Sequence, residues 1–589
     1  MLDGKGTVPG TCNPGTPGCK QGFQCQTDAE GGGQFPQYHI IGNFTTGNGT
    51  RPASINDVSS IIRYKGVFHI FHQFGQCGWA HAVSWDGAHW KNVRYPVIPD
   101  ADPQHAYDAC GCYDGSLTHS PDVNGGNPVI LYDISPASPG PPAPAPTERL
   151  VPRGHRSAAE APATTAAAAA AAAATNTSKV PLRSGDRPIQ GVARPADLDD
   201  AELQYWIKDP ANPVVGSLAG YPSQIWKNGN HWNYVADGRR KYTTDETLHS
   251  WQGATTGGGF PRGGSGGQWF QPLPGTVDGG PPPAGSPNYV ISVSGGNTYN
   301  LGWYYPGNET YRAGPVSATI NYGMQSGWAA MQSLQSDDGG LRMVHIAWLT
   351  SVPAVGSALS LLRELKYDAA IQSLVSNPMP ELAILRDQAP LFAAAHEALP
   401  PGTLFTLPLP STNAGNTVDV AATFNLDLDV DQLSSQPEEA GGFVAFAVGV
   451  FAKAGSVSES VLINVNVSTA ADPATGWRKG TVLVGPENGS GAGTSAGCPT
   501  KSRRECWAAD FNLVRGQTEV EVRVLLDRSI IEVFVAGGRV SGLVTTLPAA
   551  QEYSKIHLVA SAMNAGPIAA TNISAWGMGC GWNETRTQR

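Results

Sequence analysis

The stretch SINDVSSIIRYKGVFHIFHQF at residues 54–74 and the segment WAHAVSWD at residues 79–86 form the most informative pattern of this chain. Asp57 stands at the head of a short apolar run, and an aromatic-rich run that carries the amide of Gln73 follows it. Short runs rich in Val, Ile and Phe between turn residues are typical of β-strands. The pattern therefore predicts neighbouring strands that bring a carboxylate and an amide to one place.

The composition favours a large all-β protein. A chain of 589 residues exceeds what one hydrophobic core normally serves, so we expect two domains. Its 71 Gly, 47 Pro, 15 Trp and 18 Tyr residues predict many turns and many aromatic faces. A formal charge of -10 without a basic cluster argues against nucleic acid or an anionic membrane as a partner. The longest uniform apolar run, the alanines at residues 166–174, is shorter than the roughly 20 residues of a membrane span.

The cysteines and glycosylation sequons favour a secretory route. The nine cysteines match no zinc-binding spacing, which makes disulfides the simpler interpretation. Asn-x-Ser/Thr sequons occur along the whole chain. We expect an extracellular or vacuolar location, with the signal peptide either absent or missing from this chain, because the segment after Met1 lacks a charged region followed by an apolar one.

Changes in composition divide the chain into segments. Residues 1–35 are rich in Gly and Cys without periodicity, which predicts a disordered or disulfide-pinned leader. Strand-like runs follow, and Pro-Ala repeats at residues 136–194 predict a low-complexity surface insertion. After residue 400 the runs lengthen and alternate in polarity, as in an antiparallel β-sandwich. We expect a first domain over residues 36–395 and a sandwich over residues 402–580.

Together with residues 54–86, several later segments resemble glycoside hydrolase family 32, the invertases and fructanases. They occur in the family's order, at residues 107–116, 206–210, 321–323, 363–365, 381–386 and 524–534. The last of them, VLLDRSIIEVF, resembles the signature strand pair of the family's C-terminal domain. The resemblance implies an all-β fold with a five-bladed β-propeller before the β-sandwich. It also implies cleavage of β-fructofuranosidic bonds in sucrose or fructans.

The resemblance also implies roles for individual residues. Retaining glycosidases attack the sugar with one carboxylate, which forms a covalent intermediate, and protonate the leaving oxygen with a second carboxyl group roughly 5 to 5.5 Å away. Asp57 would be the nucleophile that attacks C2 of fructose. Asp209 would be the family's second aspartate, which stabilises the transition state. The implied substrate-binding residues are Asn56, Gln73, Trp79, Tyr113, Asp114 and Lys208, with Trp79 and Tyr113 as flat walls for the sugar ring.

Each of these residues also has a structural interpretation. Asp57 and the segment 208–210 could be turn residues, because Asn, Asp and Pro favour turns for conformational reasons. Trp79 and Tyr113 are equally compatible with a core position, because aromatic residues dominate both cores and clefts. Glu532 in the C-terminal segment is expected to be structural or interfacial.

The family's acid/base glutamate has no counterpart where the resemblance predicts it. The corresponding residues 266–274 read GGQWFQPLP and contain neither Asp nor Glu. Gly266, Phe270 or Gln271 would occupy the position, and none of them can give a proton to a leaving alkoxide. The acid/base residue is therefore unknown.

No other acidic residue replaces it convincingly. Glu505 and Cys506 resemble the missing motif only superficially, because they lie in the C-terminal domain, and neither Glu246 nor Asp278 is assigned as the acid. Two hypotheses follow: an active β-fructofuranosidase whose acid comes from an unrecognised place, or a catalytically impaired relative that binds fructosides. A structural or adhesive glycoprotein is a third class. We expect no cofactor and no metal, and these motifs do not specify the fructoside, hydrolysis or transfer, or the oligomeric state.

Overall fold

The strands predicted at residues 54–86 form because a tight turn fits between the first two apolar runs. Lys65 and Gly66 have φ values of 47° and 83°, and this left-handed geometry matches the twist of two paired strands. β1 (Ile55–Tyr64) and β2 (Val67–Phe74) therefore pair in antiparallel fashion. β3 (Trp79–Ser84) and β4 (Lys91–Arg94) complete a four-stranded sheet.

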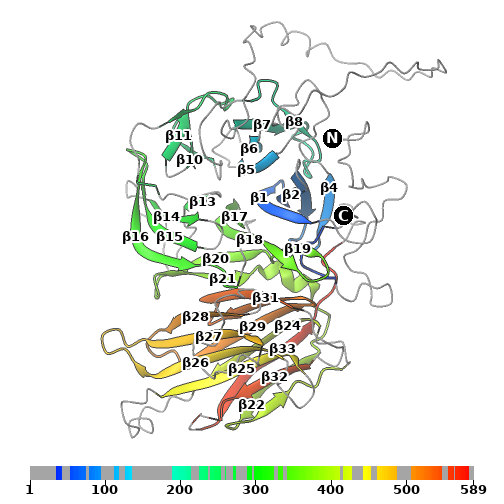
Figure 1. The fold of residues 1–589 in the computed structure, drawn as a ribbon, viewed down its shortest axis with the longest axis vertical. Coiled ribbons are helices and arrows are strands. Elements are labelled where there is room, and N and C mark those ends of the chain that lie inside the picture. Colours follow the sequence, from blue (N-terminus) through cyan, green and yellow to red (C-terminus); the bar gives the residue numbers. More distant parts are fainter. Residues whose placement is uncertain are drawn as a thin grey trace, which may run out of the picture.

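This computed structural model has two bodies, one built from the strands up to residue 378 and one from the strands after residue 391 (Figure 1). A 3-10 helix, η4 (Pro380–Leu385), lies between them in the sequence. The structure describes residues 35–42, 54–74, 79–94, 112–118, 127–134, 189–213, 225–236, 239–253, 259–260, 269–272, 288–294, 298–323, 329–335, 341–410, 416–426, 442–452, 460–486, 506–546, 555–562, 564 and 566–582. Most of the predicted leader and of the predicted insertion lies outside these residues.

Five antiparallel sheets make up the first body within the described part of the chain. Each of the four sheets after β1–β4 is built from strands that follow one another in the sequence. They are β5 (Cys112–Thr118), β6 (Val129–Ile134), β7 (Ile189–Pro195) and β8 (Trp206–Lys208); β9 (Trp226–Asn228), β10 (His231–Ala236), β11 (Arg239–Thr243) and β12 (Gln252–Gly253); β13 (Trp269–Pro272), β14 (Asn288–Ser294), β15 (Thr298–Tyr305) and β16 (Thr310–Thr319); and β17 (Ala329–Gln335), β18 (Leu341–Val352), β19 (Gly356–Leu359), β20 (Arg363–Asp368) and β21 (Ser373–Pro378).

Hydrophobic clusters join these sheets to one another. Phe71 and Trp79 of the first sheet pack with Tyr132 and Trp206, which belong to the second. Similar clusters join the second sheet to the third, the third to the fourth, and both the fourth and the fifth to the first. β1 lies beside β5 and β17, which are the first strands of their own sheets. β1 is therefore the strand of its sheet that faces the neighbouring sheets.

The second body is a sandwich of two six-stranded sheets, with strand orders β22-β33-β24-β29-β30-β31 and β23-β32-β25-β26-β27-β28. Val461, Ile463 and Val465 of β26 are buried, and the residues between them are partly exposed, as in a strand with one face on a core. The strands are β22 (Phe392–Leu399), β23 (Leu404–Thr406), β24 (Thr417–Asn425), β25 (Phe443–Ala452), β26 (Val461–Ala471), β27 (Arg478–Pro486), β28 (Trp507–Leu513), β29 (Glu519–Asp527), β30 (Ile530–Val535), β31 (Val540–Thr545), β32 (Lys555–Ala560) and β33 (Ile568–Gly577).

The sandwich begins earlier than the sequence predicted. β22 starts at Phe392 and pairs with β33, so residues 392–395 belong to the second body rather than the first, and the sandwich does not start at residue 402. The sequence of β22, FAAAHEAL, contains four alanines. Alanine is depleted in strands, and this run shows no clear alternation of apolar and polar residues. Pairing with β33 therefore holds these residues in a strand, although their own sequence favours a strand only weakly.

A fully buried ionic network joins the two bodies. Arg363 Nε and Nη2 donate to Glu532 Oε2 at 3.0 and 2.6 Å, and His39 Nε2 lies 3.1 Å from Glu532 Oε1. The other ring nitrogen of His39, Nδ1, lies 2.9 Å from Asp527 Oδ2. All four side chains are fully buried. Glu532 is therefore interfacial, as expected from the sequence.

The charges of this network shift the pKa values of its members in opposite directions. Burial alone would lower the pKa of His39, but its hydrogen bonds to Asp527 and Glu532 outweigh burial and raise it to about 9. Burial alone would raise the pKa of Glu532, but the charge of Arg363 and the hydrogen bond from His39 lower it to about 2. Both groups therefore stay ionised at neutral pH.

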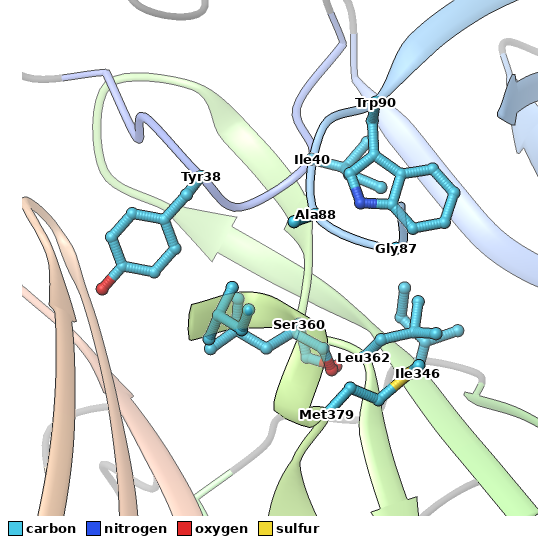
Figure 2. A pocket seen from close by; sticks show the side chains of 11 residues that line it. Tyr38, Ile40, Gly87, Ala88, Trp90, Ile346, Ser360, Leu362 and Met379 are labelled. Carbon is cyan, nitrogen blue, oxygen red and sulfur yellow. The ribbon is translucent and has the colours of Figure 1, made fainter. Parts of the chain in front are cut away.

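The chain end after β33 returns to the first sheet. Trp90 N donates to Gly581 O at 2.8 Å, and Gly581 N donates to Gln37 O at 3.0 Å. Nearby, a small cavity of about 20 Å³ lies among apolar side chains that include Ile40 and Met379 (Figure 2). This volume suits one water molecule and excludes a sugar. Among the described residues, no helix is long and apolar enough to cross a membrane.

We expect Arg363→Ala to destabilise the protein by about 3–5 kcal/mol, because it leaves the Glu532 carboxylate buried without its cationic partner. Urea-induced unfolding followed by tryptophan fluorescence measures the effect. Lys479→Ala is the matched control, since Lys479 and Asp510 form an ion pair whose side chains are both exposed, and such pairs contribute about 0–1 kcal/mol. Equal losses in the two variants would contradict the role of the network.

We expect the stability of the protein to fall as the pH rises from 7 to about 9. His39 has a folded-state pKa of about 9, above its unfolded value of about 6.5. Its contribution is therefore fully present below about pH 6.5 and is lost as the pH rises through 9. His39→Gln should flatten this part of the profile of urea midpoint against pH, whereas replacement of the exposed His396 by Gln should not. Identical profiles for the two variants would refute the assignment.

Candidate functional site

Asp57 lies near the start of β1 at an irregular point of the strand. The pairing of β1 with β2 shifts register between Ile55 and Val58, and again between Val58 and Ser60. Such irregularities re-aim side chains and are frequent next to active sites. Ser357 Oγ donates to Ile55 O at 2.8 Å and fixes the start of β1 to β19. Asp57 is 8% exposed, so this acidic residue is nearly buried on the strand that faces the neighbouring sheets.

β1 and β2 bring two of the predicted site residues, Asn56 and Gln73, into contact. Asn56 directly precedes Asp57 in the chain. Asn56 Nδ2 donates to Gln73 Oε1 at 3.3 Å, which links β1 to β2. On the next strand of this sheet, Trp79 lies directly opposite Gln73. The structure therefore contains the amide pair that the sequence placed beside the carboxylate, and the roles of these residues stay predictions.

The side chain of Trp79 belongs to the core. It is 0% exposed and packs in the cluster that joins the first two sheets. A Cβ atom at Gly115 would lie 2.7 Å from Trp79 Cζ2 and 2.6 Å from Leu131 O. Gly115 thus leaves the space that the indole fills. Of the two interpretations from the sequence, core packing is the one that this geometry favours for Trp79.

Tyr113 and Asp114 lie on β5, which neighbours β1. Ser60 Oγ donates to Leu117 O at 3.1 Å and joins the two strands. β5 has a register shift between Cys112 and Gly115, across the two predicted site residues. Their side chains lie outside the described part of the structure, so only their place on β5 is established.

Asp209 and Lys208 lie at the end of β8, which is the last strand of the second sheet. Lys208 ends β8, and Asp209 follows it and donates its N–H to Val192 O on β7. The sheet order is β5-β6-β7-β8, so three strand spacings of about 4.8 Å, roughly 14 Å in all, separate β8 from β5. β8 is thus the strand of its sheet farthest from β5, and the role predicted for Asp209 stays a prediction. A Lys-Asp-Pro motif marks a strand end but does not say which strand of the sheet it ends.

Asp209 instead lines an open cleft of about 450 Å³ between the second and third sheets. Its Oδ2 lies 2.9 Å from His249 Nε2, and its Oδ1 accepts the N–H of Ala211 at 2.9 Å. Arg194 and Thr247 line the same cleft. Asp209 is therefore part of a second polar site at the outer edge of the second sheet.

Glu246 and Asp245 are ionised and engaged in structural contacts. Glu246 Oε1 lies 2.7 Å from Lys227 Nζ, and its Oε2 accepts the indole N–H of Trp232 at 2.9 Å. The Lys227 hydrogen bond lowers the pKa of Glu246. Burial would raise the pKa of Asp245, but its bonds to Thr247 outweigh burial and lower it to about 2. A general acid must hold a proton at the working pH, so neither carboxyl group suits that role.

The segment where the acid/base residue was expected gives no further candidate. β13 includes Trp269 to Gln271, but the side chains of these residues are not described, and residues 261–268 and 273–287 lie outside the described part. Asp278 and Glu505 also lie outside it. Cys506 begins the stretch that leads into β28 of the sandwich, in agreement with the exclusion of Glu505 and Cys506 from the site.

Buried histidines behind the site were not assigned from the sequence. His69 Nδ1 lies 2.9 Å from His81 Nε2, and the ring of His81 stacks on Phe71. Burial lowers the pKa of His72 to about 4 and the pKa of His81 well below its usual value. His72 and His81 are therefore neutral at physiological pH and serve as buried polar groups of β2 and β3. The described residues contain no cluster of three or more His, Cys, Asp or Glu side chains suited to a metal ion.

A nearly buried carboxylate on a strand that faces its neighbouring sheets suits glycoside hydrolysis, which depends on carboxyl groups. Two family models match the chain: the N-terminal domain of glycosyl hydrolases family 32 at residues 50–252, and the C-terminal domain of the same family at residues 484–577. The chain belongs to glycoside hydrolase family 32.

Individual relatives agree with this membership. A β-fructofuranosidase of Oryza sativa subsp. indica, insoluble isoenzyme 3, is 22% identical, and the match covers 92% of each chain. Insoluble isoenzyme 2 of Daucus carota is 26% identical over 32% of this chain and 25% of its own length. The crystal structure of fructan 1-exohydrolase IIa from Cichorium intybus has a TM-score of 0.65 and 18% identity, and covers 93% of this chain and 98% of its own. The structural likeness confirms the propeller-and-sandwich fold class.

We expect Gly115→Ala to destabilise the protein by about 1–3 kcal/mol, because the added methyl group has no room between Trp79 and the backbone of β6. The midpoint of urea unfolding measures the loss. Gly307→Ala is the control, since a Cβ there meets nothing within 4 Å, and its effect should stay within about 0.5 kcal/mol. Equal stability of both variants would mean that Trp79 is not confined as described.

Proposed function

We propose that this protein cleaves β-fructofuranosidic bonds, in sucrose or in fructans, by a retaining mechanism with Asp57 as the nucleophile. The observation that carries the proposal is that Asp57, a residue 8% exposed, lies at the irregular start of β1 and follows Asn56, whose side chain bonds to Gln73. Family membership supports the substrate class, since a mutant of a Bombyx mori β-fructofuranosidase has been crystallised with sucrose and a variant of the Cichorium intybus enzyme with 1-kestose.

In this mechanism the Asp57 carboxylate attacks C2 of fructose. The bond from C2 to the leaving oxygen breaks with its electron pair on that oxygen, which takes up a proton, and a fructosyl-aspartate remains. Water then attacks C2 and releases fructose and the Asp57 carboxylate. In this proposal Asn56 and Gln73 bind hydroxyl groups of the sugar or orient the carboxylate, as their amide groups allow. Tyr113 and Asp114 on β5 are further candidate contacts.

The presence or absence of a proton donor distinguishes this proposal from its alternative, a relative that binds fructosides with little or no turnover. Glu246 and Asp245 are unsuited to the role for the reasons given above, and residues 266–274 contain no acid. Loss of a general acid typically slows a reaction about 10²- to 10⁴-fold. The measured rate therefore decides between the active and the impaired form.

We further propose that the five sheets of the first body are the blades of a closed five-bladed propeller. The support is the packing of each sheet on the next and of the fifth on the first. A secretory route, extracellular or vacuolar, is part of the proposal, and the disulfide bonds of Cys506 and Cys580 support it.

We expect the protein to release fructose from sucrose or 1-kestose, and Asp57→Asn to reduce the release to background, because an amide cannot form the covalent intermediate. Chromatographic quantification of fructose measures both. Asp199→Asn is the matched control, since the Asp199 side chain is 99% exposed, and it should keep the native rate. Release that survives Asp57→Asn would refute the nucleophile.

The same assay tests the role of Asp209 and the alternative function. Transition-state stabilisation by Asp209 requires that Asp209→Asn lower the rate about 10²- to 10³-fold, the scale seen when one stabilising group is removed. A small change would agree with its place at the edge of the second sheet. If the native protein releases no fructose but binds 1-kestose in ligand-observed NMR, the impaired form is correct.

A further inference from the structure

Exposed apolar side chains gather at the outer edge of the second sheet. Leu198, Tyr205 and Ile207 are 38%, 56% and 59% exposed. They are three of the five large hydrophobic residues that stand exposed in the described part of the chain, and the other two are Ile384 and Phe443. Such a concentration on a folded surface usually marks an interaction site.

The strand register places polar groups in line with these apolar ones. Backbone bonds to β7 continue past both ends of β8, since Ala196 N donates to Tyr205 O and Asp209 N donates to Val192 O. Side chains two residues apart on an extended strand share a face, so Tyr205 before β8, Ile207 on β8 and Asp209 after it lie on one side. Arg194 on β7 lies directly opposite Ile207 and shares that face. An aromatic ring, an aliphatic side chain and a guanidinium group therefore form one outward surface, and the Asp209 side chain, which is 12% exposed, lies beside it in the cleft.

This surface borders the cleft of about 450 Å³ described above. Arg194, Leu198 and Asp209 line the cleft, together with Asn127 and Thr247. Arg194 Nη2 donates to Thr247 O at 3.0 Å, which holds the guanidinium group between the second and third sheets. The volume falls in the range of small-molecule sites, which hold a few polar groups among apolar walls.

The surroundings restrict the kind of ligand. The loop from β7 to β8 carries Asp197, Asp199, Asp200 and Glu202 close to the surface, which disfavours phosphates and other anions. A stable protein interface needs about 800 Å² per partner, far more than three side chains offer. β8 has only three residues, too few to pair with an added peptide strand. A neutral sugar chain fits best, because it stacks on an exposed ring and bonds to Asp, Asn and Arg side chains.

We propose that the surface formed by Arg194, Leu198, Tyr205, Ile207 and Asp209 is a second, noncatalytic binding site for a neutral fructan chain. The choice of fructan as the chain rests on the proposed function. The site lies three strand spacings outward from β5, so it binds a part of the chain remote from Asp57. Its effect is to hold a polymeric substrate on the protein while the Asp57 site acts on another part of it.

Affinity electrophoresis of the full chain in gels that contain inulin tests the proposal. Asp57→Asn is the common background, so that the polymer stays intact during the run. We expect the inulin to retard this protein, and Tyr205→Ala or Arg194→Gln to weaken the apparent affinity about tenfold. Ile384→Ala is the matched control, because Ile384 is similarly exposed and lies on η4, away from β8. It should leave the retardation unchanged.

Several results would overturn the proposal. No retardation in the Asp57→Asn background would do so, and so would retardation that neither Tyr205→Ala nor Arg194→Gln changes, since binding would then lie elsewhere. Light scattering identifies the competing occupant: a native dimer that Tyr205→Ala dissociates, with retardation unchanged, would make the surface a protein interface. If the native protein releases no fructose, the proposed hydrolysis is refuted, whereas the result of the inulin-binding experiment is unaffected.

Discussion

The joint between the two bodies depends on one buried charge, the carboxylate of Glu532. This carboxylate forms hydrogen bonds with Arg363 of the first body and with His39 of the N-terminal segment, and it accepts the N–H of Leu361. A buried carboxylate is unfavourable unless all its partners are present. The N-terminal segment, the fifth sheet and the sandwich must therefore adopt one relative arrangement, and β1, which is attached to β19 of the fifth sheet, takes its position within it.

The all-β class and the hairpin that carries Asp57 could be predicted from the sequence. The turn at Lys65 and Gly66 and the alternation in β26 are local features, and local features are visible in a sequence. The alanine-rich β22 was missed because only its partner β33 makes it a strand. Asn56 and Gln73 were expected together, and they meet because a single hairpin separates them.

The position of Asp209 shows what a sequence motif leaves open. Its motif identifies the end of a strand, but its distance from Asp57 depends on how many strands lie between, and the sequence carries no local signal of strand order. The full burial of Trp79 is a similar case, since it depends on Gly115 in another sheet. Contacts between different sheets are thus harder to predict from the sequence than contacts within one hairpin.

The return of the chain end to the first sheet has a consequence for synthesis. Trp90 bonds to Gly581, which lies far later in the sequence, and Gly581 in turn bonds to Gln37. The ribosome must therefore synthesise the chain through Gly581 before the edge of the first sheet can close. Until then the partly folded chain exposes that edge, and an unpaired strand edge makes a chain prone to aggregation.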